Sequence, residues 1–223
     1  MRYPKTIVAT LLAVALVTHA SAGTAVQAAY EQPSQVIETA AQETLKALDA
    51  DREGYRKDPA KIQEVVDEYL LPHFDTQYAA QAVLGRYWQA ATPAQRQEFI
   101  GAFIHSMLES YGSALLGFTA NTLKVYPSHV PPDQSVATVR SEVTRANGTQ
   151  DSVIFYMKKT PEGWKAFDVH IDGVSYILSY REDFQSQIAQ QGKQGIEAII
   201  KRLEGGEKPA QISHSGGRRA GTI

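Results

Sequence analysis

The sequence predicts an α+β fold in which an antiparallel sheet of at least four strands follows one group of helices and precedes another. Three observations support this prediction. Up to Gly117 the apolar residues recur at every third or fourth position, which is the period of a helix. Beyond Gly117 they alternate with polar residues, as they do in strands. From Tyr176 the helical period returns.

The helices before the sheet have recognisable ends. They are expected over residues 34–50, 58–70, 75–84 and 92–117. The clearest start is Thr92-Pro93-Ala94-Gln95, which combines an N-cap, a proline at the first helical position and a glutamine that closes a capping box. Asp58-Pro59 and Asp75 are expected to start the second and third helices, and Gly85 to end the third.

The sheet is predicted from alternation and from turn residues. The expected strands are 121–126, 135–145, 152–158 and 164–171. Asn147-Gly148 favours a two-residue type I′ hairpin turn, and Pro161-Glu162-Gly163 favours a second tight turn. Such turns join neighbouring antiparallel strands. Two helices, 176–190 and 195–203, are expected to follow.

The last expected strand has large apolar groups on both faces. By simple alternation, Phe167, Val169 and Ile171 share one face, and Trp164, Ala166, Asp168 and His170 share the other. A strand of this kind needs cover on both sides, either from protein or from an apolar ligand.

The two ends of the chain are expected to lie outside the folded domain. Arg2 and Lys5, an apolar run from Thr6 to Val17, and the small-residue site Ala20-Ser21-Ala22 have the layout of a secretory signal peptide. Residues 1–22 are therefore expected to be cleaved, with cleavage after Ala28 as a second possibility. Residues 23–204 are expected to form one domain, and residues 205–223 a disordered tail.

Composition excludes several functions. Without the signal peptide the chain has 20 basic and 24 acidic residues, so its surface has no general attraction for nucleic acid. It contains no cysteine, which excludes disulfides, thiolate metal sites and a cysteine nucleophile. The sequence has no glycine-rich phosphate loop or metalloprotease motif, and its six histidines show no metal-ligand spacing.

Two groups of residues remain as candidates for a site. Asp168 and His170 lie two positions apart and are a candidate acid/base pair, although two titratable groups on one strand are common and structural hydrogen bonding is their ordinary explanation. A stripe at every fourth position of the long helix is the second group. Phe103, Met107, Tyr111 and Leu115 form this stripe, which fits either a filled core or the wall of an apolar cavity.

The order and spacing of several short segments resemble the MlaC/toluene-tolerance family. They are Leu71-Pro-His-Phe-Asp75, Leu84-Gly85, Trp88, Ala91-Thr-Pro-Ala-Gln-Arg96, Phe99, Phe103, Tyr111-Gly112, Trp164-Lys-Ala-Phe-Asp-Val169, Gly173-Val-Ser175, Tyr180-Arg181, Phe184 and Gly195. The resemblance runs from about residue 33 to 203. His170 departs from it, because an apolar residue is expected there.

The resemblance implies a periplasmic phospholipid carrier without catalytic residues, metal or cofactor. Its fold is expected to enclose a deep apolar cavity between a twisted sheet and the helices, with bound phospholipid as cargo. The implied partners are an outer-membrane lipoprotein complex and an inner-membrane ABC transporter with an MCE-domain subunit. The carrier is expected to be a monomer. The alternatives are a periplasmic chaperone or adaptor for peptides, and a small-molecule enzyme using Asp168 and His170.

On this reading the cavity wall comes from one helix, two strands and the segment after them. The expected lipid-binding residues are Phe103, Met107, Tyr111, Leu115, Val153, Phe155, Met157, Val169, Ile171, Val174 and Tyr176. Tyr111 and Val174 lie directly in segments that resemble the family. For the strand residues the choice depends on which face meets the ligand, because a one-residue error reverses the whole face.

Overall fold

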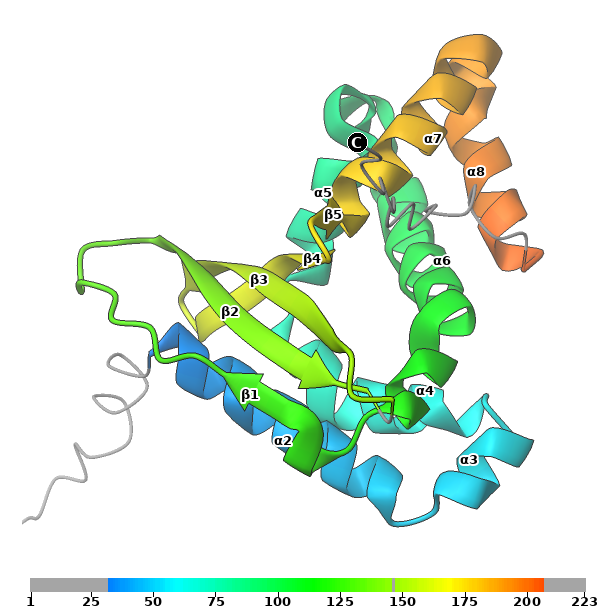
Figure 1. Cartoon of the computed structure of the whole chain (residues 1–223). Helices are drawn as coiled ribbons and strands as arrows, with labels where there is room; N and C mark the ends of the chain where they lie inside the picture. Colours follow the sequence, from blue (N-terminus) through cyan, green and yellow to red (C-terminus); the bar gives the residue numbers. More distant parts are fainter. Residues whose placement is uncertain (1–31, 146, 207–223) are drawn as a thin grey trace, which may run out of the picture.

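The computed structural model describes residues 32–145 and 147–206. The predicted signal peptide and residues 207–223 of the predicted tail lie outside these ranges. Seven α-helices and five strands are described, in the order shown in Figure 1. The helices are α2 (Pro33–Asp49), α3 (Arg52–Lys57), α4 (Lys61–Val65), α5 (Thr76–Leu84), α6 (Pro93–Tyr111), α7 (Tyr176–Gln191) and α8 (Gly195–Glu204). The strands are β1 (Leu123–Val125), β2 (Val136–Thr144), β3 (Gln150–Thr160), β4 (Gly163–Ile171) and β5 (Val174–Ser175). The predicted α+β class is confirmed.

Most helix ends follow from the capping residues. The Thr92 hydroxyl accepts a hydrogen bond from the Gln95 N–H at 3.2 Å, and the Gln95 side chain accepts one from the Thr92 N–H at 3.0 Å. Asp75 caps α5 through the N–H of Tyr78 at 2.9 Å. Gly85 ends α5 with φ of +54°, a conformation that favours glycine.

The helical segments depart from the prediction in three places. The short helix α3 was not predicted, because it has no buried residue and therefore no apolar stripe. The second predicted helix starts later, at Lys61, and its last turn, Val66–Leu70, is a π-helix. The long helix α6 ends at Tyr111, and Gly112–Gly117 continue as a 3₁₀-helix.

The sheet is a meander in which each strand pairs antiparallel with the next, in the order β1-β2-β3-β4-β5. The β2–β3 turn differs from the predicted type I′ turn. The Arg145 N–H donates to the Thr149 carbonyl at 2.8 Å, so three residues and not two separate the paired positions. Gly148 has φ of +81°, which a three-residue loop with a glycine bulge requires. The β3–β4 turn has the two residues Pro161 and Glu162 between paired Thr160 and Gly163.

A bulge in β4 changes which residues share a face. Ala166 pairs with Met157 and Asp168 pairs with Tyr156, so Phe167 is an extra residue without a partner. Beyond a bulge the alternation restarts one residue later. Trp164, Ala166, Val169 and Ile171 therefore lie on one face of the sheet. The predicted division of residues between the two faces of this strand was wrong, because simple alternation does not anticipate a bulge. No residue of β4 is exposed, so both of its faces are covered.

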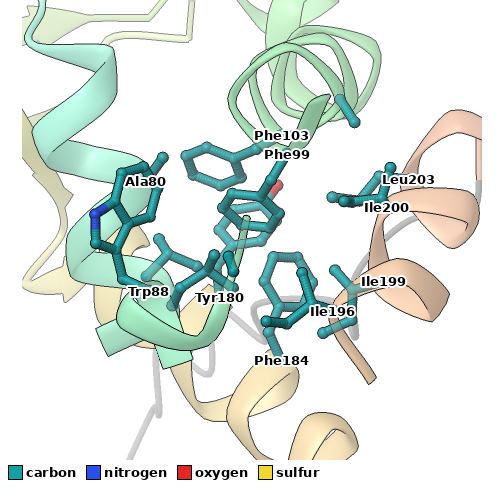
Figure 2. Packing of buried hydrophobic residues seen from close by; sticks show 14 of the residues in the cluster. Ala80, Trp88, Phe99, Phe103, Tyr180, Phe184, Ile196, Ile199, Ile200 and Leu203 are labelled. Atoms are coloured by element: carbon teal, nitrogen blue, oxygen red, sulfur yellow. The ribbon is translucent and has the colours of Figure 1, made fainter. Parts of the chain in front are cut away.

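The helices form two groups beside the sheet, and the first consists of α2, α3 and α4 (Figure 1). Helix α2 lies along the sheet and contacts β2 and β4, where Val36 and Ile37 join a core with Val139, Met157 and Trp164. The second group consists of α5, α6, α7 and α8, which pack around a separate aromatic and aliphatic core. Figure 2 shows this core, with Phe99, Phe103, Tyr180 and Phe184 between α6 and α7 and the isoleucines of α8 beside them.

Helix α8 is fixed to α7 by polar and steric contacts. The Arg202 guanidinium binds the Asp183 carboxylate, donates to Gln187 Oε1 at 2.7 Å and lies 5.1 Å from the centre of the Phe184 ring. Gly195 lies so close to Ile188 that a Cβ would stand 2.6 Å from its Cα. No helix within residues 32–145 and 147–206 is long and apolar enough to cross a membrane.

Candidate functional site: an apolar cavity between sheet and helices

A cavity of about 320 Å³ lies between the sheet and the helices. Its lining is almost entirely apolar and comes from α2, the π-helical turn, α5, α6, α7 and four of the strands. The helical wall includes Ala41, Leu45, Val66, Leu70, Leu71, Phe103, Ile104, Met107, Leu108, Tyr111, Leu115, Tyr176 and Ile177. The sheet wall includes Leu123, Ser141, Val143, Val153, Phe155, Phe167, Val169 and Ile171.

Helix α6 divides its apolar stripe between a filled core and the cavity. Phe99 is fully buried in the core with Phe184, and Phe103 stacks edge-on against Tyr180 at 5.1 Å. About one and two turns beyond Phe103, Met107 and Tyr111 are only partly buried and line the cavity. The second group of helices packs against the first half of the stripe and leaves the other half open. This division explains why periodicity alone could not separate core from cavity.

The sheet divides in the same way along its strands. On the face toward α2, Ala137, Met157 and Ala166 are closed by the helix and fully or nearly fully buried. Further along the same face the cavity begins, lined by paired Phe155 and Val169 and by paired Val153 and Ile171. The helix therefore covers one end of the face and the cavity lies under the other.

The structure brings nine of the eleven predicted site residues to the cavity lining. They are Phe103, Met107, Tyr111, Leu115, Val153, Phe155, Val169, Ile171 and Tyr176. Met157 lies elsewhere, on the same face but in the core under α2. Val174 is also outside the lining; it is half-buried on β5, paired with Ile171. Contact of any of these residues with a lipid remains a prediction.

Several lining residues were not predicted. Ala41, Thr44 and Leu45 lie on α2, Leu70 ends the π-helix and Leu71 follows it; all belong to or directly follow the first two predicted helices, which were not assigned to the site. Phe118 comes from the loop before β1. An apolar stripe looks the same whether it faces a core or a cavity, so only tertiary packing could identify these residues.

The polar groups of the lining mostly have partners within the protein. The Thr44 hydroxyl donates to the Ala40 carbonyl at 2.7 Å, and the Ser141 hydroxyl donates to the Val153 carbonyl at 2.9 Å. Such internally paired groups have little capacity left for a ligand, and the cavity is effectively apolar at these positions.

Asp168 is the one carboxylate of the described lining, and it is an acceptor for several donors. Its oxygens accept hydrogen bonds from the Ser175 hydroxyl at 2.7 Å, the Ile177 N–H at 3.2 Å and the Val169 N–H at 2.8 Å. The Nε2 atom of His170 lies 3.0 Å from the same carboxylate. These contacts join the start of α7 to β4, where a negative charge is favoured by the helix dipole. Asp168 and His170 are thus in contact, in an arrangement that structural hydrogen bonding explains.

Three tyrosines lie where α6 ends and α7 begins. Tyr111 and Tyr176 line the cavity with their rings edge-on at 4.9 Å, and Tyr180 is buried beside them. Burial raises the pKa of the Tyr176 hydroxyl from 10.0 to about 12 and raises the pKa of Tyr111 and of Tyr180 as well. All three therefore remain neutral hydrogen-bond donors at physiological pH.

These features define a class of protein: an α+β domain with an apolar cavity between sheet and helices, suited to hold an apolar ligand. The model of the MlaC protein family matches residues 38–205, so the chain belongs to the MlaC family. The resemblance proposed from the sequence is confirmed.

Relatives and a solved structure agree with this assignment. The intermembrane phospholipid transport system binding protein MlaC of Haemophilus influenzae is 25% identical over 175 residues, which cover 77% of this chain and 80% of that protein. The toluene tolerance protein ttg2D of Pseudomonas putida is 27% identical over 165 residues, which cover 74% and 76% of the two chains. A phospholipid-binding protein from Ralstonia solanacearum, solved in complex with a phospholipid, superposes with a TM-score of 0.71 and 26% identity, over 79% of this chain and 97% of that chain.

Proposed function

We propose that this protein is a periplasmic phospholipid carrier that buries acyl tails in the cavity between sheet and helices. The observation that carries the proposal is the apolar lining, in which the polar groups of Thr44, Ser141 and Asp168 are already paired. The phospholipid bound in the related Ralstonia structure supports it, as does the transport role in the name of the Haemophilus relative. The proposal assigns no catalytic step to the protein.

The energetics of lipid transfer suit such a cavity. Exposing a methylene group to water costs about 0.8 kcal/mol, so a tail of about sixteen carbons costs on the order of 12 kcal/mol. A cavity of 320 Å³ lies at the lower end of the range for small-ligand sites, about 300–1,000 Å³. Burial in the cavity would remove most of this cost without making or breaking a bond.

The proposed partners follow from the same role. The carrier would receive or deliver phospholipid at an outer-membrane lipoprotein complex and at an inner-membrane ABC transporter with an MCE-domain subunit. Such exchange would maintain the lipid asymmetry of the outer membrane. The transport system in the name of the Haemophilus relative supports this part of the proposal.

Native mass spectrometry of the purified protein tests the function. We expect phospholipid to remain bound, and a lipid-stripped sample to take up labelled phospholipid from vesicles. Met107→Glu should abolish uptake, because Met107 lines the cavity and a carboxylate there opposes burial of a tail.

Gln97→Glu is the matched control. It makes the same charge change on the same helix, at an exposed position. Uptake by this variant should equal that of the native chain. A native chain that carries no phospholipid and takes none up would contradict the proposal, and bound lipid displaced by apolar peptides would favour a peptide-binding role instead.

A further inference from the structure

The hydroxyl groups at the junction of α6 and α7 form a cluster with an unmet hydrogen-bonding need. The Tyr180 hydroxyl lies beside that of Tyr111, and each affects the pKa of the other. Tyr180 is 1% exposed, and its hydroxyl has no hydrogen-bond partner within residues 32–145 and 147–206. The buried Ser110 hydroxyl has none in this part of the chain either.

A buried donor without an acceptor is unfavourable, and hydroxyls can satisfy one another only in part. When hydroxyl groups hydrogen-bond in a row, each oxygen accepts a hydrogen bond from the hydroxyl before it. The proton of the last hydroxyl still needs an acceptor outside the row. Tyr180 and Ser110 are behind the wall, whereas Tyr111 lines the cavity. The free proton of such a row would therefore be presented to the cavity by Tyr111.

The electrostatics of the lining indicate what kind of acceptor fits. The described lining contains no lysine, arginine or histidine, and its one carboxylate is Asp168. An anionic acceptor would enter an apolar site without a cation and near a like charge, which is costly. A neutral carbonyl oxygen has no such penalty.

We infer that the cluster of Ser110, Tyr111 and Tyr180 is the binding site for an ester carbonyl of the acyl lipid. In the complex, Tyr111 donates to the carbonyl oxygen, and the Tyr111 oxygen becomes the acceptor that the neighbouring Tyr180 hydroxyl otherwise lacks among the described residues. This inference rests on the proposed function and adds to it a preference for ester-linked over ether-linked lipids. It also places the glycerol region of the lipid between the end of α6 and the start of α7, with the tails toward the sheet.

A comparison of two phospholipids tests the inference. A diester phosphatidylcholine and its diether analogue, with equal chains, differ in the carbonyl groups alone. We expect the native chain to bind the diester about tenfold more tightly, the effect of one hydrogen bond in an apolar site. Tyr111→Phe should bring the ratio of the affinities for diester and diether close to one, and Tyr180→Phe should reduce this ratio. Palmitate at pH 8 should bind more weakly than the diester.

Tyr126→Phe is the control, because the Tyr126 hydroxyl donates to Glu142 and lies outside the cavity lining. It should keep the native ratio. Infrared spectra of carbonyl-labelled lipid give a second readout: the carbonyl band should lie at lower frequency in the native complex than in the Tyr111→Phe complex.

The possible failures are distinct. Equal binding of diester and diether by the native chain, with no difference in the carbonyl band, would overturn the ester site and leave the carrier function intact. In another outcome, palmitate binds more tightly than the diester and loses this binding in Tyr111→Phe. That result would show that the cluster binds a carboxylate and not an ester carbonyl. Failure to bind either phospholipid would contradict the carrier function itself.

Discussion

The Ser175 hydroxyl donates a 2.7 Å hydrogen bond to the carboxylate of Asp168 and at the same time caps α7 by accepting from the Leu178 N–H at 3.0 Å. Two residues thus join the last long strand to the helix that follows it. Because the Ile177 N–H also donates to Asp168, the first turn of α7 is held by a charge from another element.

Asp168→Asn is expected to destabilise the fold. The amide group would lose the charge and place an N–H₂ where a donor already points. A lost hydrogen bond to a charged group is worth about 1.5–3 kcal/mol. Urea unfolding measures the change. The control is Asp172→Asn, at a nearby exposed position with φ of +50°, which asparagine adopts readily. Equal stability of the two variants would show that the contacts of Asp168 contribute little.

The bulge at Phe167 leads to a second prediction, which concerns the face of the sheet that each β4 residue occupies after a deletion. Deletion of Phe167 removes the extra residue, so Trp164, Ala166, Val169 and Ile171 all stay on the face they occupy now. We expect a folded protein, destabilised by about 1–3 kcal/mol through loss of a half-buried phenylalanine that contacts Tyr78.

Deletion of Val169 is the matched control for this prediction. It would turn Ile171 away from the cavity and His170 toward it, and we expect it to prevent cooperative folding. Circular dichroism and urea unfolding of the two deletions give the comparison. Loss of folding in both deletions alike would mean that the bulge itself is required for the fold.

The same bulge shows how far the sequence could determine the site. Caps such as Thr92 and turns such as Pro161-Glu162 are local, so the sequence predicted the helices and the order of the strands. The face of β4 depends on an extra residue that local sequence does not reveal. Which half of an apolar stripe meets a cavity depends on where neighbouring helices stop packing, so Leu45 and Leu70 were missed and Met157 was included.

Val169 and Val174 provide a direct comparison between a cavity residue and a neighbour outside the lining. Val169→Glu should abolish phospholipid uptake, because it places a carboxylate against the tails. Val174→Glu should retain most of the uptake, since Val174 is half-buried on β5 and lies outside the lining. Uptake from labelled vesicles measures both. Loss of uptake in Val174→Glu, with unchanged stability, would extend the lipid site to β5.

The buried tyrosines make the stability of the protein depend on pH in the alkaline range. The pKa of Tyr176 is about 12 in the folded chain, against an ordinary value of 10.0, because burial disfavours the phenolate. Because the pKa of the hydroxyl is higher in the folded than in the unfolded chain, the protonated tyrosine favours the folded state. Its contribution is complete well below pH 10, and it is lost as pH rises from about 10 to about 12, by less than about 1.4 kcal/mol per pH unit.

Tyr176→Phe removes this titration while keeping most of the ring packing against Tyr111. The free energy of unfolding of the variant should therefore fall less steeply above pH 10 than that of the native chain, by about 1 kcal/mol between pH 10 and 11. Tyr180, whose pKa burial also raises, continues to titrate in the variant, so some decrease remains. Urea unfolding at pH 7, 9, 10 and 11 makes the measurement, and the two proteins should show the same pH dependence between 7 and 9. Equal slopes between pH 10 and 11 would show that the Tyr176 hydroxyl reaches solvent in the folded protein.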